Sequence, residues 1–284
     1  MSKTPNIGAH VRAAGGLWTA IENAKRIGAS CIQIFGASPR QWNAKIPSDA
    51  DVKKFKYTLK ESGLNSVYLH AAYLVNLATP QRELLEKSIR NLTDHLKIAE
   101  MIGAEGLIFH PGSSKGMKSR ESGLDQEVRA IQKILKSVPG KAKLIIENTA
   151  GGGEKVGTAE DIQYLYKKIK SERVKVCIDT AHAFEEGMIE KYTKLEIKKL
   201  VDTWDRAVGL KNIPVLHIND SKTEYASHHD RHENIGEGHI GIQGFRALAK
   251  EPRLQGKDWI LEVPGFKNEG PDKKNIDIIK SHFR

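Results

Sequence analysis

The sequence predicts a single α/β domain, residues 1–284, folded as a closed parallel (β/α)₈ barrel. Eight short runs rich in Val, Ile and Leu recur along the chain, as is typical of strands covered on both faces. Longer amphipathic stretches separate these runs, so strands and helices alternate. The length of 284 residues suits such a barrel, which usually needs about 250 residues. A doubly wound open sheet is the structural alternative.

The expected elements follow one another in strict alternation. The strands are Asn6–His10, Cys31–Phe35, Ser66–His70, Gly106–His110, Leu144–Glu147, Val174–Asp179, Val215–Asn219 and Trp259–Val263. The clearest helices are Leu17–Ile27, Asp49–Ser62, Pro80–Ile102, Leu124–Val138, Ala159–Ile169 and Lys194–Val208. Ser48 and Thr158 each stand directly before a helix, with an Asp three residues further on, which is the spacing of a capping box. We expect His95 and His282, which lie on helices, to be surface residues.

The charge balance favours a polyanionic partner. The chain has 45 Lys and Arg against 35 Asp and Glu, a formal net charge of +10, and nucleic acid is the first candidate. Cys31 and Cys177 lie inside apolar runs and are expected to be buried, which fits a reducing compartment. The first ten residues lack an apolar signal-peptide core, and no run reaches the roughly 18 apolar residues of a membrane span. We therefore expect a soluble, cytoplasmic monomer without a membrane partner.

Metal-capable side chains lie at the end of six consecutive predicted strands, or within two residues of it. They are His70, His110, Glu147, Asp179, His217 and Glu262. In a barrel the carboxyl ends of all strands converge on one face, where active sites lie. Carboxylates that directly follow apolar runs need a partner, because buried Asp and Glu are rarely tolerated unless paired or metal-bound. One such residue has ordinary structural explanations, but six in succession indicate a metal site at the C-terminal face of the strands.

Two short motifs raise the number of candidate ligands to nine. Asp179 and His182 are three apart in DTAHAF, which we expect to be a loop leaving a strand, and Asp230 and His232 lie in the glycine-containing loop HHDRHENIGEG. Nine ligands exceed the three or so that a single catalytic ion keeps, so two or three ions are expected. Mixed imidazole and carboxylate ligands suit zinc, and also manganese or iron. Several ions held together favour phosphoryl chemistry.

Seven motifs in the same order resemble the endonuclease IV family. They are GAHVRAAGGL, HAAYLVNLA, FHPGS, IENTAG, CIDTAHAF, HINDSK and DRHENIGEGHIG, and the resemblance runs from Ile7 to about Glu262. It implies a zinc-dependent enzyme on a (β/α)₈ barrel that cuts double-stranded DNA 5′ to abasic sites. The products would be a 3′-hydroxyl and a 5′-deoxyribose phosphate, and blocked 3′ ends would also be trimmed. Val263 departs from the family, which usually has Thr there.

The resemblance also implies a role for each ligand. Three zinc ions would be bound, with manganese or iron as an alternative at one position. Their respective ligand sets would be His70, His110 and Glu147, then Glu147, Asp179, His217 and Glu262, and finally His182, Asp230 and His232. Glu147 would bridge two ions, and Glu147 and Glu262 would be the catalytic residues that position the attacking hydroxide. Asn148 is a candidate to orient Glu147 by a hydrogen bond.

Two segments resemble the DNA-reading loops of that family. They contain Arg40, Gln41 and Trp42 in ASPRQW, and Tyr73 and Leu74 in HAAYLVN. Apolar wedges inserted from the minor groove unstack base steps, and displacing a nucleotide costs least where pairing is already lost. The alternative is that Trp42 and Leu74 merely pack under surface loops. His10 ends the first strand, and either contacts substrate phosphate or lines the pocket.

Two other functions compete with this hypothesis. A metal-dependent sugar isomerase or epimerase of the same barrel superfamily would share the pattern Glu147, Asp179, His217 and Glu262, but that argument is an analogy of fold. The additional histidines and Asp230, together with the charge of +10, oppose it. A nucleic-acid binder that has lost catalysis would fit the charge equally well, but would not need nine intact ligands.

Overall fold

The strands close into a parallel barrel, as the sequence predicts. The computed structural model describes residues 4–38 and 41–283. Its barrel strands are β1 Ile7–His10, β2 Cys31–Phe35, β3 Ser66–His70, β4 Gly106–Phe109, β6 Lys143–Glu147, β8 Val174–Asp179, β9 Val215–His217 and β12 Asp258–Leu261. Each strand pairs with its neighbours in parallel, and β1 pairs with both β2 and β12, which closes the ring. The strand ends move by one or two residues, so His110 and Glu262 lie directly after their strands.

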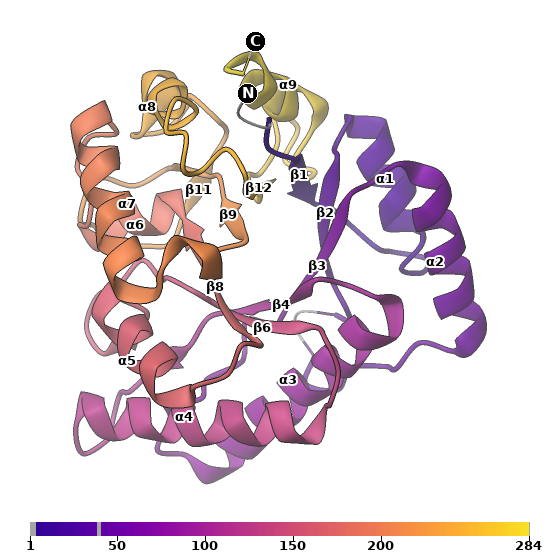
Figure 1. Cartoon of the computed structure of the whole chain (residues 1–284), viewed down its shortest axis with the longest axis vertical. Coiled ribbons are helices and arrows are strands. Elements are labelled where there is room, and N and C mark those ends of the chain that lie inside the picture. The colour runs from indigo at the N-terminus through magenta and orange to yellow at the C-terminus, as the bar shows by residue number, and fades with distance from the viewer. Residues whose placement is uncertain (1–3, 39–40, 284) are drawn as a thin grey trace.

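A ring of helices surrounds the strands (Figure 1). The helices are α1 Thr19–Ile27, α2 Asp49–Ser62, α3 Arg82–Ile102, α4 Arg120–Ser137, α5 Ala159–Ile169, α6 Thr180–Glu186, α7 Lys194–Val208, α8 Gly241–Leu248 and α9 Lys273–Ser281. Capping boxes begin α2 at Ser48 and α5 at Thr158, in agreement with the sequence pattern. Among the residues that the model describes, no helix has both the length and the apolar character to cross a membrane.

Helix α4 begins four residues before its predicted start. Ser119 caps it and accepts a hydrogen bond from the backbone of Ser122, whose side chain accepts one from the backbone of Ser119 in return. A second serine thus takes the place of the acidic residue that usually completes this motif.

The prediction that His95 lies at the surface is wrong. His95 is 1% exposed, on the face of α3 that packs on the barrel, and its ring donates a hydrogen bond to the carbonyl of Asn91.

An apolar layer fills the barrel interior below the carboxyl ends of the strands. It consists of Cys31, Tyr68, Ile108, Ile145, Cys177, Val215 and Ile260. Both cysteines are buried, as expected. Because side chains alternate along a strand, the residue two positions after each member of this layer also points into the barrel. The layer therefore sets which side chains meet above it.

Two short two-stranded sheets are built from the loops that follow the strands. β5 Gly112–Ser113 pairs with β7 Lys155–Val156, and β10 Asp220–Ser221 pairs with β11 His232–Glu233, both antiparallel. The segment predicted as a glycine-containing loop thus includes β11, which fixes His232 against the loop after β9. Asp220 also holds the segment after β11 in place, because its carboxylate accepts hydrogen bonds from the backbone N–H groups of Gly236, Gly238 and Ile240.

Candidate metal centre

The ring of side chains above the apolar layer is almost entirely metal-capable. Two residues after each member of that layer come Gln33, His70, His110, Glu147, Asp179, His217 and Glu262. They converge at the carboxyl ends of the strands, where a cavity of about 540 Å³ opens. His70, His110 and Glu262 line this cavity, together with His182 of α6 and the loop residue Asp230. The alternation of strand residues therefore brings together the side chains that the sequence places at strand ends.

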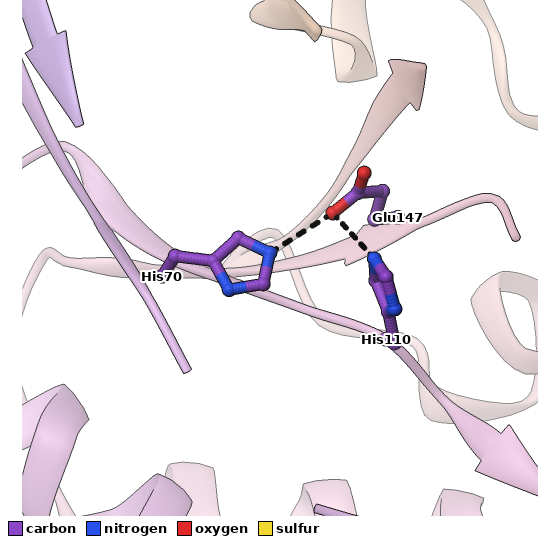
Figure 2. A group of neighbouring side chains, drawn as sticks. All are labelled: His70, His110 and Glu147. Carbon is purple, nitrogen blue, oxygen red and sulfur yellow. Dashed lines mark hydrogen bonds and ion pairs between the residues drawn. The ribbon is translucent and has the colours of Figure 1, made fainter. Parts of the chain in front are cut away.

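The first group of ligands meets at one oxygen of Glu147 (Figure 2). The Nε2 atoms of His70 and His110 each lie 3.1 Å from Glu147 Oε2. The Nδ1–H of His70 donates to the carbonyl of Ala71 at 2.9 Å, because a carbonyl oxygen only accepts. In neutral His70 the lone pair is therefore on Nε2 and points at the carboxylate.

The second group uses the other oxygen of Glu147. His217 Nδ1 lies 2.8 Å from Glu147 Oε1, 3.2 Å from Glu262 Oε2 and 3.8 Å from Asp179 Oδ2. Asn219 fixes Asp179 by donating its amide N–H to Oδ2 at 2.6 Å. Glu147 belongs to both groups, and its two oxygens face different partners. This is the geometry that a bridging carboxylate requires.

The third group comes from loops and from a short helix. His182 Nε2 lies 3.3 Å from Asp230 Oδ2, and His232 Nε2 lies 3.6 Å from Asp230 Oδ1. His182 is not in a loop, as expected from the sequence, but in the first turn of α6. Asp179 caps this helix by accepting the backbone N–H of His182 at 2.9 Å. One aspartate thus starts the helix and turns its second oxygen toward the second group.

Asn148 orients residues other than the one predicted. Its side chain binds the backbone N–H and carbonyl of Asp179, and not Glu147. Its own carbonyl accepts the Nδ1–H of His182 at 2.9 Å. The lone pair of neutral His182 is therefore on Nε2, which faces Asp230. Holding the remote nitrogen of an imidazole on a carbonyl is the usual way in which proteins orient metal-binding histidines.

The site concentrates hydrogen-bond acceptors around a few points. One donor atom from each residue of the first two groups lies within 4.8 Å of the others in its group, and Asp179, His182 and His232 form a further group of this kind. Lone pairs that face carboxylates in a buried space repel one another unless a cation lies between them. A proton or a metal ion can fill that role. The chemistry of these donors therefore fits metal ions, and their mixed imidazole and carboxylate character fits zinc.

The pKa values show the same attraction for positive charge. Burial would raise the pKa of Glu147, but the imidazoles of His217 and His110 lower it well below the ordinary value. Burial would lower the pKa of His182, yet Asp179 and Asp230 raise it well above the ordinary value. The centre therefore stabilises cations at its nitrogen atoms.

Sequence reasoning missed two polar residues of this site. Gln33 is fully buried on β2 and contacts both His217 and Glu262. Glu185 is fully buried on α6, and one of its oxygens lies within 4.8 Å of donor atoms of His182 and Asp230. Gln33 could have been found from the sequence, because it is an amide inside the apolar run CIQIF. Glu185 carried no comparable signal, because acidic residues are common on helices.

The predicted DNA-reading residues lie in different surroundings. Tyr73 and Leu74 are 69% and 39% exposed after β3, and Tyr73 lines the cavity, where its ring packs edge-on against Phe35. Gln41 is exposed, whereas Trp42 is half-buried and its carbonyl accepts a hydrogen bond from Asn91. Arg40 lies outside the described residues.

His10 reaches into the cavity from β1. Its Nδ1 is 2.9 Å from the amide nitrogen of Gln33 and 3.1 Å from Glu262 Oε1. It lines the pocket, and its Nδ1 lies within hydrogen-bonding distance of the candidate ligand Glu262.

Comparison with known proteins identifies relatives of this chain over nearly its whole length. Residues 21–282 match the family described as xylose isomerase-like TIM barrel. The probable endonuclease 4 of Halothermothrix orenii is 36% identical over 96% of this chain and 99% of its own. The crystal structure of endonuclease IV from Thermus thermophilus superimposes with a TM-score of 0.84 at 35% identity, covering 98% of this chain and 99% of that one.

Sugar-converting proteins share the architecture at a greater distance. A D-tagatose 3-epimerase-like protein matches with a TM-score of 0.72 over 97% of both chains, but at 18% identity, which shows the fold alone. The Halothermothrix orenii and Thermus thermophilus proteins, by contrast, match at 36% and 35% identity over nearly the whole length. With its barrel and its buried imidazole–carboxylate groups, this chain therefore belongs to the endonuclease IV family, the AP endonucleases built on a xylose isomerase-like TIM barrel.

Proposed function

We propose that this enzyme hydrolyses the phosphodiester bond 5′ to abasic sites in double-stranded DNA, at a centre of three zinc ions. The products would be a 3′-hydroxyl and a 5′-deoxyribose phosphate, and the same centre would trim blocked 3′ ends. The observation that carries the proposal is the convergence of three groups of ligands on one cavity, with Glu147 shared by two of them. Manganese or iron in place of one zinc is compatible with the same ligands.

The ligand groups correspond to three ions. We assign His70, His110 and Glu147 to the first, and Glu147, Asp179, His217 and Glu262 to the second. We assign His182, Asp230 and His232 to the third. Bound zinc supplies Lewis acidity, which neutralises phosphate charge and lowers the pKa of water toward neutrality.

The two glutamates are suited to hold the attacking water. Glu262 points one oxygen at His217, while its other oxygen accepts hydrogen bonds from Gln33 and lies 3.1 Å from His10. Glu147 is held between imidazoles on both sides. Carboxylates fixed in this way can accept a proton from water without first reorganising. We therefore propose Glu147 and Glu262 as the catalytic residues.

Recognition of the lesion would use the exposed residues at the rim. Tyr73 presents an aromatic side chain and Leu74 an apolar one to solvent, and Tyr73 lines the cavity. This arrangement fits a wedge that enters the base stack. Gln41 is exposed close by in the chain, and His10 faces the cavity, so both are proposed DNA contacts, together with Trp42 and Arg40. The net charge of +10 supports phosphate binding.

A sugar epimerase is the competing function, and the third group of ligands argues against it. The strand-end ligands Glu147, Asp179, His217 and Glu262 would be sufficient for an isomerase. Asp230 and His232 are brought to the cavity by a separate hairpin. Further ligands arranged around a shared cavity suit a phosphodiester, which carries negative charge that a neutral sugar lacks.

The test is incision of a labelled duplex with one tetrahydrofuran abasic analogue, which cannot undergo β-elimination. We expect a single cut 5′ to the analogue, lost after prolonged chelation and restored by zinc. Glu147→Ala should lose zinc and cleavage, whereas Glu105→Ala, which removes an exposed carboxylate just before β4, should retain both. A zinc-loaded wild-type protein that leaves the duplex intact would refute the function. Wild-type cleavage by Glu147→Ala would refute the assignment of the centre.

A further inference from the structure

We infer that Gln33 is a positioning residue of the metal centre: its amide fixes the ring of His217 and one oxygen of Glu262 together. This inference rests on the proposed function. Gln33 is fully buried, and it occupies the ring position on β2 that corresponds to the ligands on the neighbouring strands. It is placed like a ligand, but as an amide it acts on the ligands beside it.

The orientation of the amide follows from its neighbours. Its nitrogen lies 2.5 Å from Glu262 Oε1, and an amide oxygen at that place would face a carboxylate that only accepts. The NH₂ group therefore points at Glu262, and the same amide nitrogen lies 2.9 Å from Nδ1 of His10. The amide oxygen of Gln33 must then point the opposite way.

The oxygen of Gln33 determines which ring nitrogen carries the hydrogen in neutral His217. It lies 2.8 Å from His217 Nε2, which must be the donor because an amide oxygen accepts. Neutral His217 then carries its lone pair on Nδ1, the atom that lies 2.8 Å from Glu147 Oε1 and 3.2 Å from Glu262 Oε2. One amide thus turns both the imidazole and the carboxylate toward the second group of ligands.

Two substitutions separate the two halves of this role. Gln33→Met has a similar shape, but it neither accepts from His217 nor donates to Glu262. Gln33→Glu keeps an acceptor for His217 but faces Glu262 with a second carboxylate. Gln126→Met is the matched control, because Gln126 is half-buried and donates two hydrogen bonds, to the carbonyls of Leu77 and Thr79, away from the metal centre.

Two measurements report on the centre independently of turnover. Zinc affinity is measured by competition with a chelator, and the His217 Nε2–H proton is followed by NMR of the zinc-loaded protein. Loss of a partner that orients a ligand typically weakens metal binding about 10- to 100-fold, and we expect that loss for one ion in Gln33→Met. The Nε2–H resonance should exchange rapidly in Gln33→Met but stay protected in Gln33→Glu. Gln33→Glu should also bind zinc more weakly, and Gln126→Met should match wild type.

The outcomes separate this inference from the proposed function. Incision by the wild-type, zinc-loaded protein tests the function. With that established, zinc affinity at the wild-type level in both Gln33 variants would overturn the inference. If Gln33→Met does not fold, Gln33→Glu decides alone, and wild-type zinc affinity in that variant is the overturning result.

Discussion

Replacing Glu127 by methionine should stabilise the enzyme. Glu127 lies on α4 and is fully buried, and neither of its carboxylate oxygens has a hydrogen-bond partner among the described residues. Arg120 does not neutralise it, because the Arg120 guanidinium is bonded to Asp161. Burial, followed by the charge of Asp161, raises the pKa of Glu127 well above its ordinary value. The fold therefore buries a carboxyl group whose two oxygens are left without a hydrogen bond.

The size of the effect follows from the unsatisfied group. A buried polar group without a partner costs about 1–3 kcal/mol, and methionine has a similar shape without that cost. We expect Glu127→Met to raise the free energy of unfolding by about this amount near neutral pH. For a domain of this size, each kcal/mol corresponds to a rise in Tm of about 2 °C.

The pH dependence gives the prediction its sharpest form. A carboxyl group whose folded pKa is raised contributes its full stability below the ordinary value of 4.5, and that stability is lost as pH rises through the folded pKa. The advantage of Glu127→Met should therefore grow as pH rises above 4.5 toward the raised pKa of Glu127. Chemical denaturation of the zinc-loaded wild type and variant gives the free energy of unfolding of each at several pH values. The metal centre titrates in the same way in both proteins, so its contribution cancels in the difference between the two free energies.

A control on the same helix completes this test. Gln132 is exposed on α4, and Gln132→Met should change stability little at any pH. A Glu127→Met protein that is less stable than wild type, or whose advantage does not vary with pH, would refute the reasoning.

Three further predictions concern the site. Tyr73→Ala should weaken binding to a duplex with the tetrahydrofuran analogue about 10-fold and keep its zinc, by analogy with the loss of base stacking on an aromatic ring. Tyr57→Ala is the control, because Tyr57 is also 69% exposed but lies on α2, and its affinity should not change. Equal affinities of the two variants in a binding titration would contradict this prediction. Glu185→Ala leaves the backbone N–H of Arg231 without its acceptor and should speed the loss of one zinc ion to a chelator. Glu185→Gln keeps an acceptor and should retain zinc like the wild type. Identical zinc retention in the two variants would refute the prediction. Removal of zinc by a chelator should lower Tm. Zinc added at 100 times its Kd should raise the free energy of unfolding again by about 2.7 kcal/mol for each site. A Tm that does not change on chelation would show that the folded protein binds no zinc tightly.

The barrel could be predicted from sequence because its strands are short, apolar and regularly spaced. Errors arose where a local pattern was unusual. Ser122 replaced an acidic residue in the capping box of α4, and α6 has only seven residues, too few to show a helical period. His95 lies between Leu92 and Leu96 on the buried face of α3, so its position there could have been recognised. The domain limits of 1–284, the monomeric state and the cytoplasmic location stay predictions.

The candidate ligands could be located from sequence, but the direction of their lone pairs could not. A strand-end position determines that His70 or His217 points into the barrel. It does not determine which ring nitrogen carries the proton, because that depends on the carbonyl of Ala71 and the amide of Gln33. These partners are set by three-dimensional packing and not by a spacing in the chain.

The same distinction explains how one barrel can carry different reactions. Glu147, Asp179, His217 and Glu262 occupy strand ends, which every member of this architecture can supply. The third group depends on the segments that follow the strands. Asp179 caps helix α6 and so places His182, and the pairing of β10 with β11 places His232. Loops are free to vary while the strands are fixed by the core, so the reaction is decided by what the loops add to a common ring. In this chain they add imidazoles and a carboxylate around a shared cavity, which is what a phosphodiester requires and a sugar does not.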